Sequence, residues 1–352
     1  MWLVGATFAV SFLIPSLITA VTGTLLSSDG RGYLQDFTAT FSIGVGLPIL
    51  VLFFTHYCER IPQVLSDIDS ERTIKIGKKK YKDILVRFEK VYNSKWSITL
   101  LIPAAGLQLL WIIPLLNDYT LTWWSSYVSS SGNESISAAG LYFVFLAILY
   151  LYLVLHSILY FALTALLLRT IAKEAKEVKV RPLHPDDCGG LSKIGSIGLL
   201  SSYLIFLIGI GIVGVIHSDM YVHGHLPFSL PLHSILITLY LVFAPLLFFL
   251  PLYSFRAPMK LAKNQSLAYF SQMFETEYRR LPKKLDVNDK DEVHKILTEL
   301  ATISTSYDLA KKMPVWPFNL KLIERFSAIV IAPLLLIALP MILEKYIFKI
   351  SI

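Results

Sequence analysis

The fold is decided by residues 139–168, which read AGLYFVFLAILYLYLVLHSILYFALTALLL. This stretch contains no Asp, Glu, Lys or Arg. A helix that crosses a hydrocarbon core of roughly 30 Å needs about 20 apolar residues, so the stretch is long enough to span a membrane. Comparable charge-free stretches lie elsewhere in the chain, at 1–28, 37–58, 96–117, 194–218 and 326–343.

The composition of the whole chain agrees with this local pattern. Of the 352 residues, 55% are hydrophobic and 16% are charged, whereas an average soluble domain has about 25% charged residues. The apolar fraction, the 18 Gly and the two Cys exclude a collagen, a disordered chain and a disulfide-stapled secreted scaffold. The sequence therefore predicts an all-α integral protein of the cell membrane.

Seven segments are apolar enough to cross the bilayer, near 2–25, 38–57, 96–116, 139–168, 194–217, 230–255 and 322–345. We therefore predict seven transmembrane helices and a helical bundle in the cytoplasm. The expected units are spans one and two (1–57), a basic amphipathic cytoplasmic segment (58–95), spans three and four (96–168), a cytoplasmic stalk and turn (169–193), spans five and six (194–255), a cytoplasmic helical hairpin (256–318), and span seven with a short external tail (319–352).

The distribution of basic residues predicts the orientation. Lys and Arg are retained on the cytoplasmic side of short loops. The segments 58–95, 169–193 and 256–325 hold 10, 6 and 13 of them, which is 29 of the 32. All three segments lie on one side of a seven-helix path, so the N-terminus is expected inside and the C-terminus outside. Because the basic charge belongs to this inner face, nucleic acid is not an expected partner.

The first basic segment contains candidates for binding anionic lipids at the inner face, namely Lys78, Lys79, Lys80, Lys82, Arg87 and Lys90. They accompany an apolar stripe at helical spacing, formed by Tyr81, Ile84, Leu85, Phe88, Val91 and Tyr92. Such a helix suits the anionic inner leaflet, with its apolar face in the bilayer. The alternative is that the stripe packs on neighbouring protein and the lysines are only solvated.

The fourth span is expected to continue beyond the membrane. Its helical pattern has no break from 139 to 180, which corresponds to roughly 60 Å, and it ends before Pro182. Two more amphipathic segments follow the sixth span, and we expect the turn Leu281-Pro282-Lys283-Lys284 to join them. These three helices would form the cytoplasmic bundle, and Pro314-Val315-Trp316-Pro317-Phe318 would form an interfacial elbow into the seventh span.

The sharpest local motif is His184-Pro185-Asp186-Asp187-Cys188-Gly189-Gly190-Leu191. Its imidazole, thiol and carboxylates could bind a metal or place an acid beside a base. The alternative is structural: Pro185 blocks helix, Asp187 caps the start of the fifth span, and the two glycines permit a sharp turn. We favour the structural alternative, because four ligands so close together cannot readily surround one ion.

The same motif carries a family resemblance. It resembles a His-Pro-Asp, Gly-Gly-Leu signature of a family of uncharacterised prokaryotic integral membrane proteins, which also have an elbow similar to 314–318 before the last span. The resemblance extends from Arg181 to the end of the chain and implies a polytopic membrane protein without an assigned activity. Asp187-Cys188 stands here where the resemblance implies a basic residue followed by a small one.

Inside the predicted membrane, Tyr152, His156, Tyr160 and Thr164 recur at intervals of four and share one face of the fourth span. A polar stripe in lipid should face protein or a water-filled cavity. It could line a pore or ligand pocket gated by protonation of His156. Hydrogen bonding between helices, with no ligand, is the favoured alternative.

Four histidines gather near the predicted outer loop between the fifth and sixth spans, namely His217, His223, His225 and His233. Neutral imidazoles can bind zinc or copper, but loop histidines without a carboxylate partner make only a weak metal candidate. We therefore expect no metal and no other cofactor.

The topology favours an ion channel or channel-like sensor, assembled as a homo-oligomer. It is similar to the topology of the insect chemoreceptor-type seven-helix channels, in which the final helix lines a shared pore, although no residue motif of those channels is matched. The alternatives are a membrane enzyme or metal-dependent factor that uses His184, Asp186, Asp187 and Cys188, and a membrane scaffold.

Overall fold

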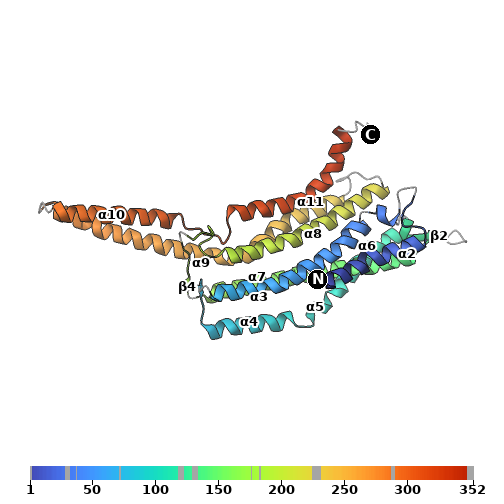
Figure 1. Cartoon of the computed structure of the whole chain (residues 1–352), viewed down its shortest axis with the longest axis horizontal. Helices are drawn as coiled ribbons and strands as arrows, with labels where there is room; N and C mark the ends of the chain where they lie inside the picture. Colours follow the sequence, from blue (N-terminus) through green and yellow to red (C-terminus); the bar gives the residue numbers. More distant parts are fainter. Residues whose placement is uncertain are drawn as a thin grey trace.

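The computed structural model describes residues 2–27, 32–36, 38–70, 73–117, 123–128, 134–175, 177–181, 184–223, 231–286 and 290–346. The described chain is almost entirely helical, and its long helices run roughly along one axis (Figure 1). Five of them are long and apolar enough to cross a membrane: Trp2–Val21, Ala39–Ile68, Ala138–Glu174, Ser192–His217 and Pro231–Pro282. The prediction of an all-α protein with membrane-spanning helices is confirmed at this level.

The first two of these five are composite rods. Helices α1 (Trp2–Phe8) and α2 (Ile14–Val21) are joined without a break by a π-helical turn, Ala9–Leu13. A second π-helical segment, Thr38–Val45, leads directly into α3 (Gly46–Ser70). Ser11 Oγ donates to the Gly44 carbonyl at 2.7 Å, so the two rods are linked by a buried polar contact.

The other predicted spans are also helical. Short α5 (Trp96–Thr99) precedes α6 (Leu101–Asn117), and these are followed by α7 (Ala138–Glu174), α8 (Ser192–His223), α9 (Pro231–Asp286) and α11 (Leu320–Tyr346). Helix α6 has 17 residues and α11 has 27.

Helix α7 ends earlier than predicted. The sequence pattern predicted a continuous helix to residue 180, but the helix ends at Glu174, and Ala175 is already extended. Strand β4 (Glu177–Val178) then pairs antiparallel with β1 (Ile74–Lys75), which follows α3. Val178 and Ile74 are both buried in the main core. Pairing with a distant strand therefore replaces the last turn of the expected helix, and α7 is not the projecting stalk.

The projection is formed instead by α9 and α10 (Lys290–Lys311), which pack along one another beyond the end of the other helices (Figure 1). Helix α9 has 56 residues, about 84 Å at 1.5 Å per residue, so the sixth predicted span and the following amphipathic segment are one helix. Pro282 lies inside it, so the turn predicted at 281–284 is wrong. The expected three-helix bundle is a two-helix hairpin in the described chain.

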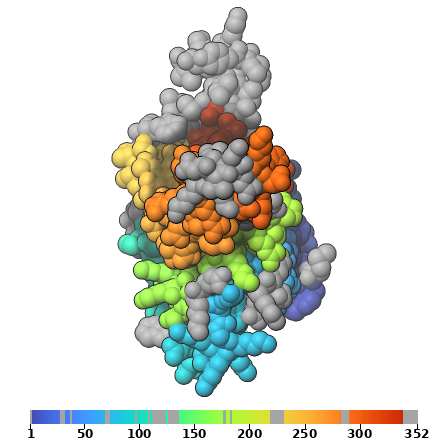
Figure 2. All heavy atoms as spheres, turned by 90° about the vertical axis from the view of Figure 1, so that its left-hand side faces the viewer, coloured from blue at the N-terminus to red at the C-terminus, as the bar shows by residue number. Residues whose placement is uncertain are grey.

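The main core lies where α3, α7, α8 and α9 meet. Small residues allow close approach: a Cβ on Gly209 of α8 would lie 2.7 Å from Pro333 Cγ of α11. Helix α4 (Lys78–Tyr92) packs its apolar side chains against this core. Figure 2 views the hairpin end, with α9 and α10 in orange, α4 in light blue, and the end of α7 and the start of α8 in yellow-green between them.

A second short ladder lies at the far end of the molecule. Strands β2 (Ser126–Val128) and β3 (Glu134–Ile136) pair antiparallel, next to a 3-10 turn at Trp123–Ser125. Trp124 is 1% exposed and donates its indole N–H to Asp36 at 3.0 Å. This contact fastens the segment before α7 to the 3-10 turn at Tyr33–Gln35.

Candidate functional site

The carboxylate of Asp186 organises the turn between β4 and α8. Its Oδ1 accepts the backbone N–H of Cys188 at 2.9 Å, and its Oδ2 accepts the N–H of Ser192, the first residue of α8, at 3.1 Å. Both oxygens accept the N–H of Gly190, at 3.0 and 3.1 Å. His184 Nδ1 lies 2.7 Å from Oδ1. One side chain thus holds the turn closed and satisfies an N–H at the start of α8.

These contacts determine the ionisation of Asp186. Burial of the carboxylate acts to raise its pKa, but the backbone N–H groups of Gly190, Cys188 and Ser192 and the His184 imidazole lower the pKa to about 2. The charged form is therefore the one that the turn stabilises.

The aspartate that caps α8 is not the one predicted from the sequence. Asp187 was expected to cap the fifth span, but Asp186 does so, and Asp187 is exposed with a left-handed φ of 55°. Gly189 and Gly190 have φ of 70° and 91°, and a Cβ on Gly189 would lie 2.5 Å from Val180 Cγ1. Both glycines are needed for the turn, as expected.

Cys188 is inaccessible at this site. It is 0% exposed, and burial, together with the negative charges of Asp186 and Asp187, raises the pKa of its thiol to about 12. Since the thiolate is the nucleophile and metal ligand, this environment disfavours both roles. Within the residues that the structure describes, no three His, Cys, Asp or Glu side chains form a metal-binding group.

The elbow at 314–318 packs directly against this turn. Asn319 donates its side-chain amide to the Asp186 carbonyl at 3.5 Å and accepts the N–H of Leu322 at 3.1 Å, so it joins the turn to the start of α11. A Cβ on Gly195, in the first turns of α8, would lie 2.2 Å from the Pro317 carbonyl oxygen. The two sequence motifs, far apart in the chain, therefore form one junction.

A groove of about 510 Å³ opens at this junction. It is lined by Asp187 from the turn and by side chains between Pro314 and Ile323. Most of the lining is apolar, with polar groups from Asp187, Asn319 and Lys321. We call it the elbow groove. Its volume is within the range of ligand pockets, about 300–1,000 Å³.

Trp316 in the wall of the groove is held by aromatic and cationic neighbours. Its ring centroid lies 5.2 Å from that of Phe318 and 6.1 Å from that of Phe249. The Arg256 guanidinium carbon lies 4.9 Å from the ring centroid, in the geometry of a cation–π contact. Lys263 donates to the Met313 carbonyl at 3.1 Å, which fixes the chain just before the elbow to α9.

The predicted polar stripe of α7 is only partly inside the protein, since Tyr152 and His156 are half-buried. Thr164 and Tyr160 are buried, and the Tyr160 ring contacts Tyr57 of α3 and Tyr92 of α4, with centroids 5.3 and 4.2 Å away. His156 contacts Phe54 and Tyr152, at 5.0 and 5.8 Å. Its buried Nδ1 has no hydrogen-bond partner among the described residues. Most of the stripe therefore serves packing between helices.

Helix α4 uses its apolar stripe to pack on the protein. Tyr81, Ile84, Leu85, Phe88 and Tyr92 lie against the main core, and Tyr81 donates to the Leu65 carbonyl at 2.7 Å. The six basic candidates, Lys78, Lys79, Lys80, Lys82, Arg87 and Lys90, are all exposed, and Lys80 pairs with Glu174 at the end of α7. Protein packing thus accounts for five of the six residues of the apolar stripe, and the sixth, Val91, is 52% exposed.

The predicted outer histidines are only partly within the described structure. His225 and the side chain of His223 lie outside it, whereas His233 is buried at the start of α9 and His217 is half-buried in α8. No arrangement of metal ligands is seen among the described members.

Comparison with known proteins adds no relative: no protein family, curated protein or solved structure matches this chain. The fold therefore defines only a class, an all-helical protein with several helices long and apolar enough to cross a membrane.

Sequence reasoning singled out the turn and the elbow separately but missed the groove between them. The contact that joins them runs from the Asn319 side chain to the backbone carbonyl of Asp186, 133 positions earlier, and a backbone carbonyl carries no sequence signal of its partner.

Proposed function

We propose that this chain is a channel-like membrane sensor, in which the α9–α10 hairpin controls the position of α11. One observation carries the proposal: α9 runs without a break from a membrane-spanning segment to the far end of the hairpin, and α10 returns to the elbow that begins α11. A displacement of the hairpin would therefore reach α11 through α10 and the short connection at 312–319.

The proposal includes seven spans, with the N-terminus inside and the C-terminus outside. The charge distribution supports this orientation, because 29 of the 32 basic residues fall in 58–95, 169–193 and 256–325. The described parts of these segments include β1, β4 and the hairpin, which lie toward one end of the molecule (Figure 1). This seven-span topology is similar to that of the insect chemoreceptor-type channels. The proposal also places the chain in the family with the His-Pro-Asp, Gly-Gly-Leu signature.

Assembly of several copies is also part of the proposal. The hairpin exposes large apolar side chains, including Tyr269 (58%), Tyr278 (57%), Leu297 (49%) and Phe274 (39%). On a segment placed in the cytoplasm, such a surface is typical of a protein contact. Self-association of the hairpins would bring several α11 helices around one axis.

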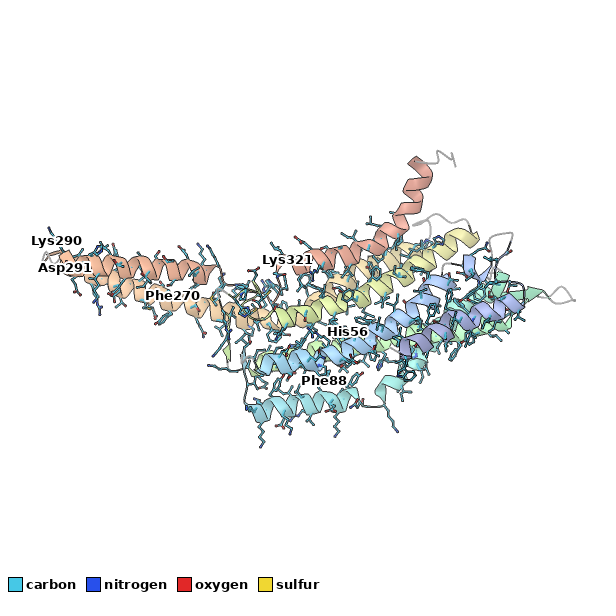
Figure 3. All side chains as sticks on the ribbon, viewed as in Figure 1. His56, Phe88, Phe270, Lys290, Asp291 and Lys321 are labelled. Carbon is cyan, nitrogen blue, oxygen red and sulfur yellow. The ribbon has the colours of Figure 1, made fainter. Side chains whose placement is uncertain are left out.

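Ion conduction tests the proposal. The purified full chain, reconstituted in planar bilayers, is expected to carry single-channel currents that His156→Ala alters, because the half-buried His156 imidazole of α7 packs against Phe54 of α3. The matched control is His56→Ala, which removes an exposed imidazole from α3 (Figure 3). Silence across voltage, pH and lipid composition would reject the channel function.

The environment of the turn gives no support to the alternative of a membrane enzyme or metal-dependent factor. The Asp186 carboxylate is occupied by backbone N–H groups, and Cys188 is buried. A scaffold stays as the alternative if the protein assembles but does not conduct.

A further inference from the structure

We propose that the elbow groove binds the headgroup of a zwitterionic phospholipid, with Lys321 holding the phosphate and Asp187 the ammonium group. The two side chains line the same groove of about 510 Å³ and carry opposite charges. Both are exposed, and neither forms an ion pair with another described residue. Two available charges of opposite sign match a ligand that itself carries both signs.

The surroundings of the groove suit the surface of a bilayer. Trp316 forms one wall, and indole rings favour the depth of the lipid headgroups. Its ring is kept in place by Arg256, 4.9 Å away. Figure 3 shows Lys321 in the first turn of α11, beside the elbow. A phosphate bound there would lie shortly before the charge-free stretch 326–343 of α11.

The surface for the acyl chains lies further along α11, beyond the exposed Glu324 and Arg325 in its second turn. Leu320 lines the groove and is 76% exposed. Ile331 and Leu335 lie further along the same face of α11, since 11 residues make about three helical turns, and they are 48% and 60% exposed. A lipid with its headgroup in the groove can therefore lay an acyl chain along α11.

The sign of the charges selects among lipid classes. Lys321 can contact the phosphate that every phospholipid has, so it supplies affinity without choosing the class. Asp187 attracts an ammonium group and repels a headgroup with only negative charge. The two residues therefore make separate predictions, and neither depends on whether the protein conducts ions.

Native mass spectrometry of the delipidated full chain in detergent tests the site. The probes are phosphatidylethanolamine, phosphatidylglycerol with the same acyl chains, and glycerophosphoethanolamine, which has the headgroup alone. We expect phosphatidylethanolamine to bind about tenfold more tightly than phosphatidylglycerol, as one charge-assisted contact would give. Glycerophosphoethanolamine should bind far more weakly because it lacks the chains.

Two variants separate the roles. Asp187→Asn should bring the affinities for the two lipids to within about twofold, and Asn tolerates the left-handed backbone of this position. Lys321→Gln should weaken both lipids by about tenfold. The matched controls are Asp291→Asn and Lys290→Gln, exposed residues at the other end of α10 (Figure 3), which should change neither affinity.

Three results would overturn the proposal. The first is equal binding of the two lipids by the unmodified chain. The second is a preference that Asp187→Asn leaves unchanged while the circular dichroism spectrum shows a folded protein. The third is glycerophosphoethanolamine binding as tightly as the whole lipid, which would make the groove a site for a soluble ligand.

Discussion

Gly195 lies so close to Pro317 that a Cβ on the glycine would be 2.2 Å from the proline's carbonyl oxygen. This contact joins the first turns of α8 to the elbow before α11 and leaves no room for a side chain. Together with the Asn319 contact to the Asp186 carbonyl, it makes the turn and the elbow a single junction.

Gly195→Ala should therefore destabilise the protein by about 1–3 kcal/mol, the usual cost of overpacking. Thermal unfolding of the purified chain in detergent would measure the loss. Gly106→Ala in α6 is the matched control, because a Cβ there meets nothing within 4 Å. That substitution should be neutral or stabilising by up to about 1 kcal/mol. Equal stability of the two variants would contradict the close contact.

Asp186→Asn should remove a pH-dependent contribution to stability. The pKa of this carboxyl is lowered to about 2 in the folded protein, against about 3.9 in an unfolded chain. The stabilisation is therefore fully present above about pH 4 and lost as the pH falls toward 2. After allowance for solvent screening, it is worth about 1–2 kcal/mol.

Unfolding of the wild type and the Asp186→Asn variant, compared at pH 6 and near pH 2, measures this effect. The gap between them should be present at pH 6 and close as the pH falls. Asp187→Asn, at the exposed neighbour, should change stability by less than about 0.5 kcal/mol at either pH. A constant gap would show that the charge of Asp186 has no stabilising role.

The thiol of Cys188 should resist alkylation in the folded protein. It is 0% exposed and its pKa is raised to about 12, so very little thiolate forms at pH 8. With Cys58→Ser present to remove the other thiol, N-ethylmaleimide should react at least about 100-fold more slowly than in the denatured chain. Intact-mass measurement over time gives both rates. Similar rates would mean that the turn opens readily.

Replacing Phe274 and Tyr278 together by Ser should reduce the oligomeric state without unfolding the chain. Both side chains are exposed on α9 and stack on each other, with centroids 6.1 Å apart. Light scattering with size-exclusion chromatography measures the mass of the assembly, and circular dichroism shows whether the variant is folded. As a control, Thr302→Ala with Thr305→Ala changes exposed polar residues of α10 and should leave the mass unchanged. If the wild-type protein is a monomer, the proposed assembly through the hairpin is wrong.

Local sequence patterns were sufficient to predict which segments are helical. The stretch 139–168 is helical along its whole length, because uninterrupted apolar residues in lipid must satisfy their backbone groups within one helix. The helix end predicted at Pro282 was wrong, because α9 continues through this proline to Asp286. The end of α7 was also missed, because it depends on Ile74 pairing with Val178, a contact invisible to a local pattern.

The sequence predicted the glycine turn of the candidate site but not the aspartate that caps α8. Gly189 and Gly190 follow a proline and two aspartates, a pattern that predicts a turn, and they have the left-handed backbone that this turn requires. Which aspartate would cap α8 was not predictable, because both are close enough in sequence. In the folded turn, Asp187 has a left-handed backbone and Asp186 accepts the N–H groups of Cys188, Gly190 and Ser192.

The sequence by itself determined that the chain has several helices long and apolar enough to cross a membrane, since this depends only on the length of its charge-free runs. It also determined where basic charge gathers, because that is a count along the chain. Only the tertiary structure decided that α9 and α10 project as a hairpin and that the turn and elbow enclose a groove. Those features depend on contacts between residues far apart in the chain, and such contacts leave no periodic trace in the sequence.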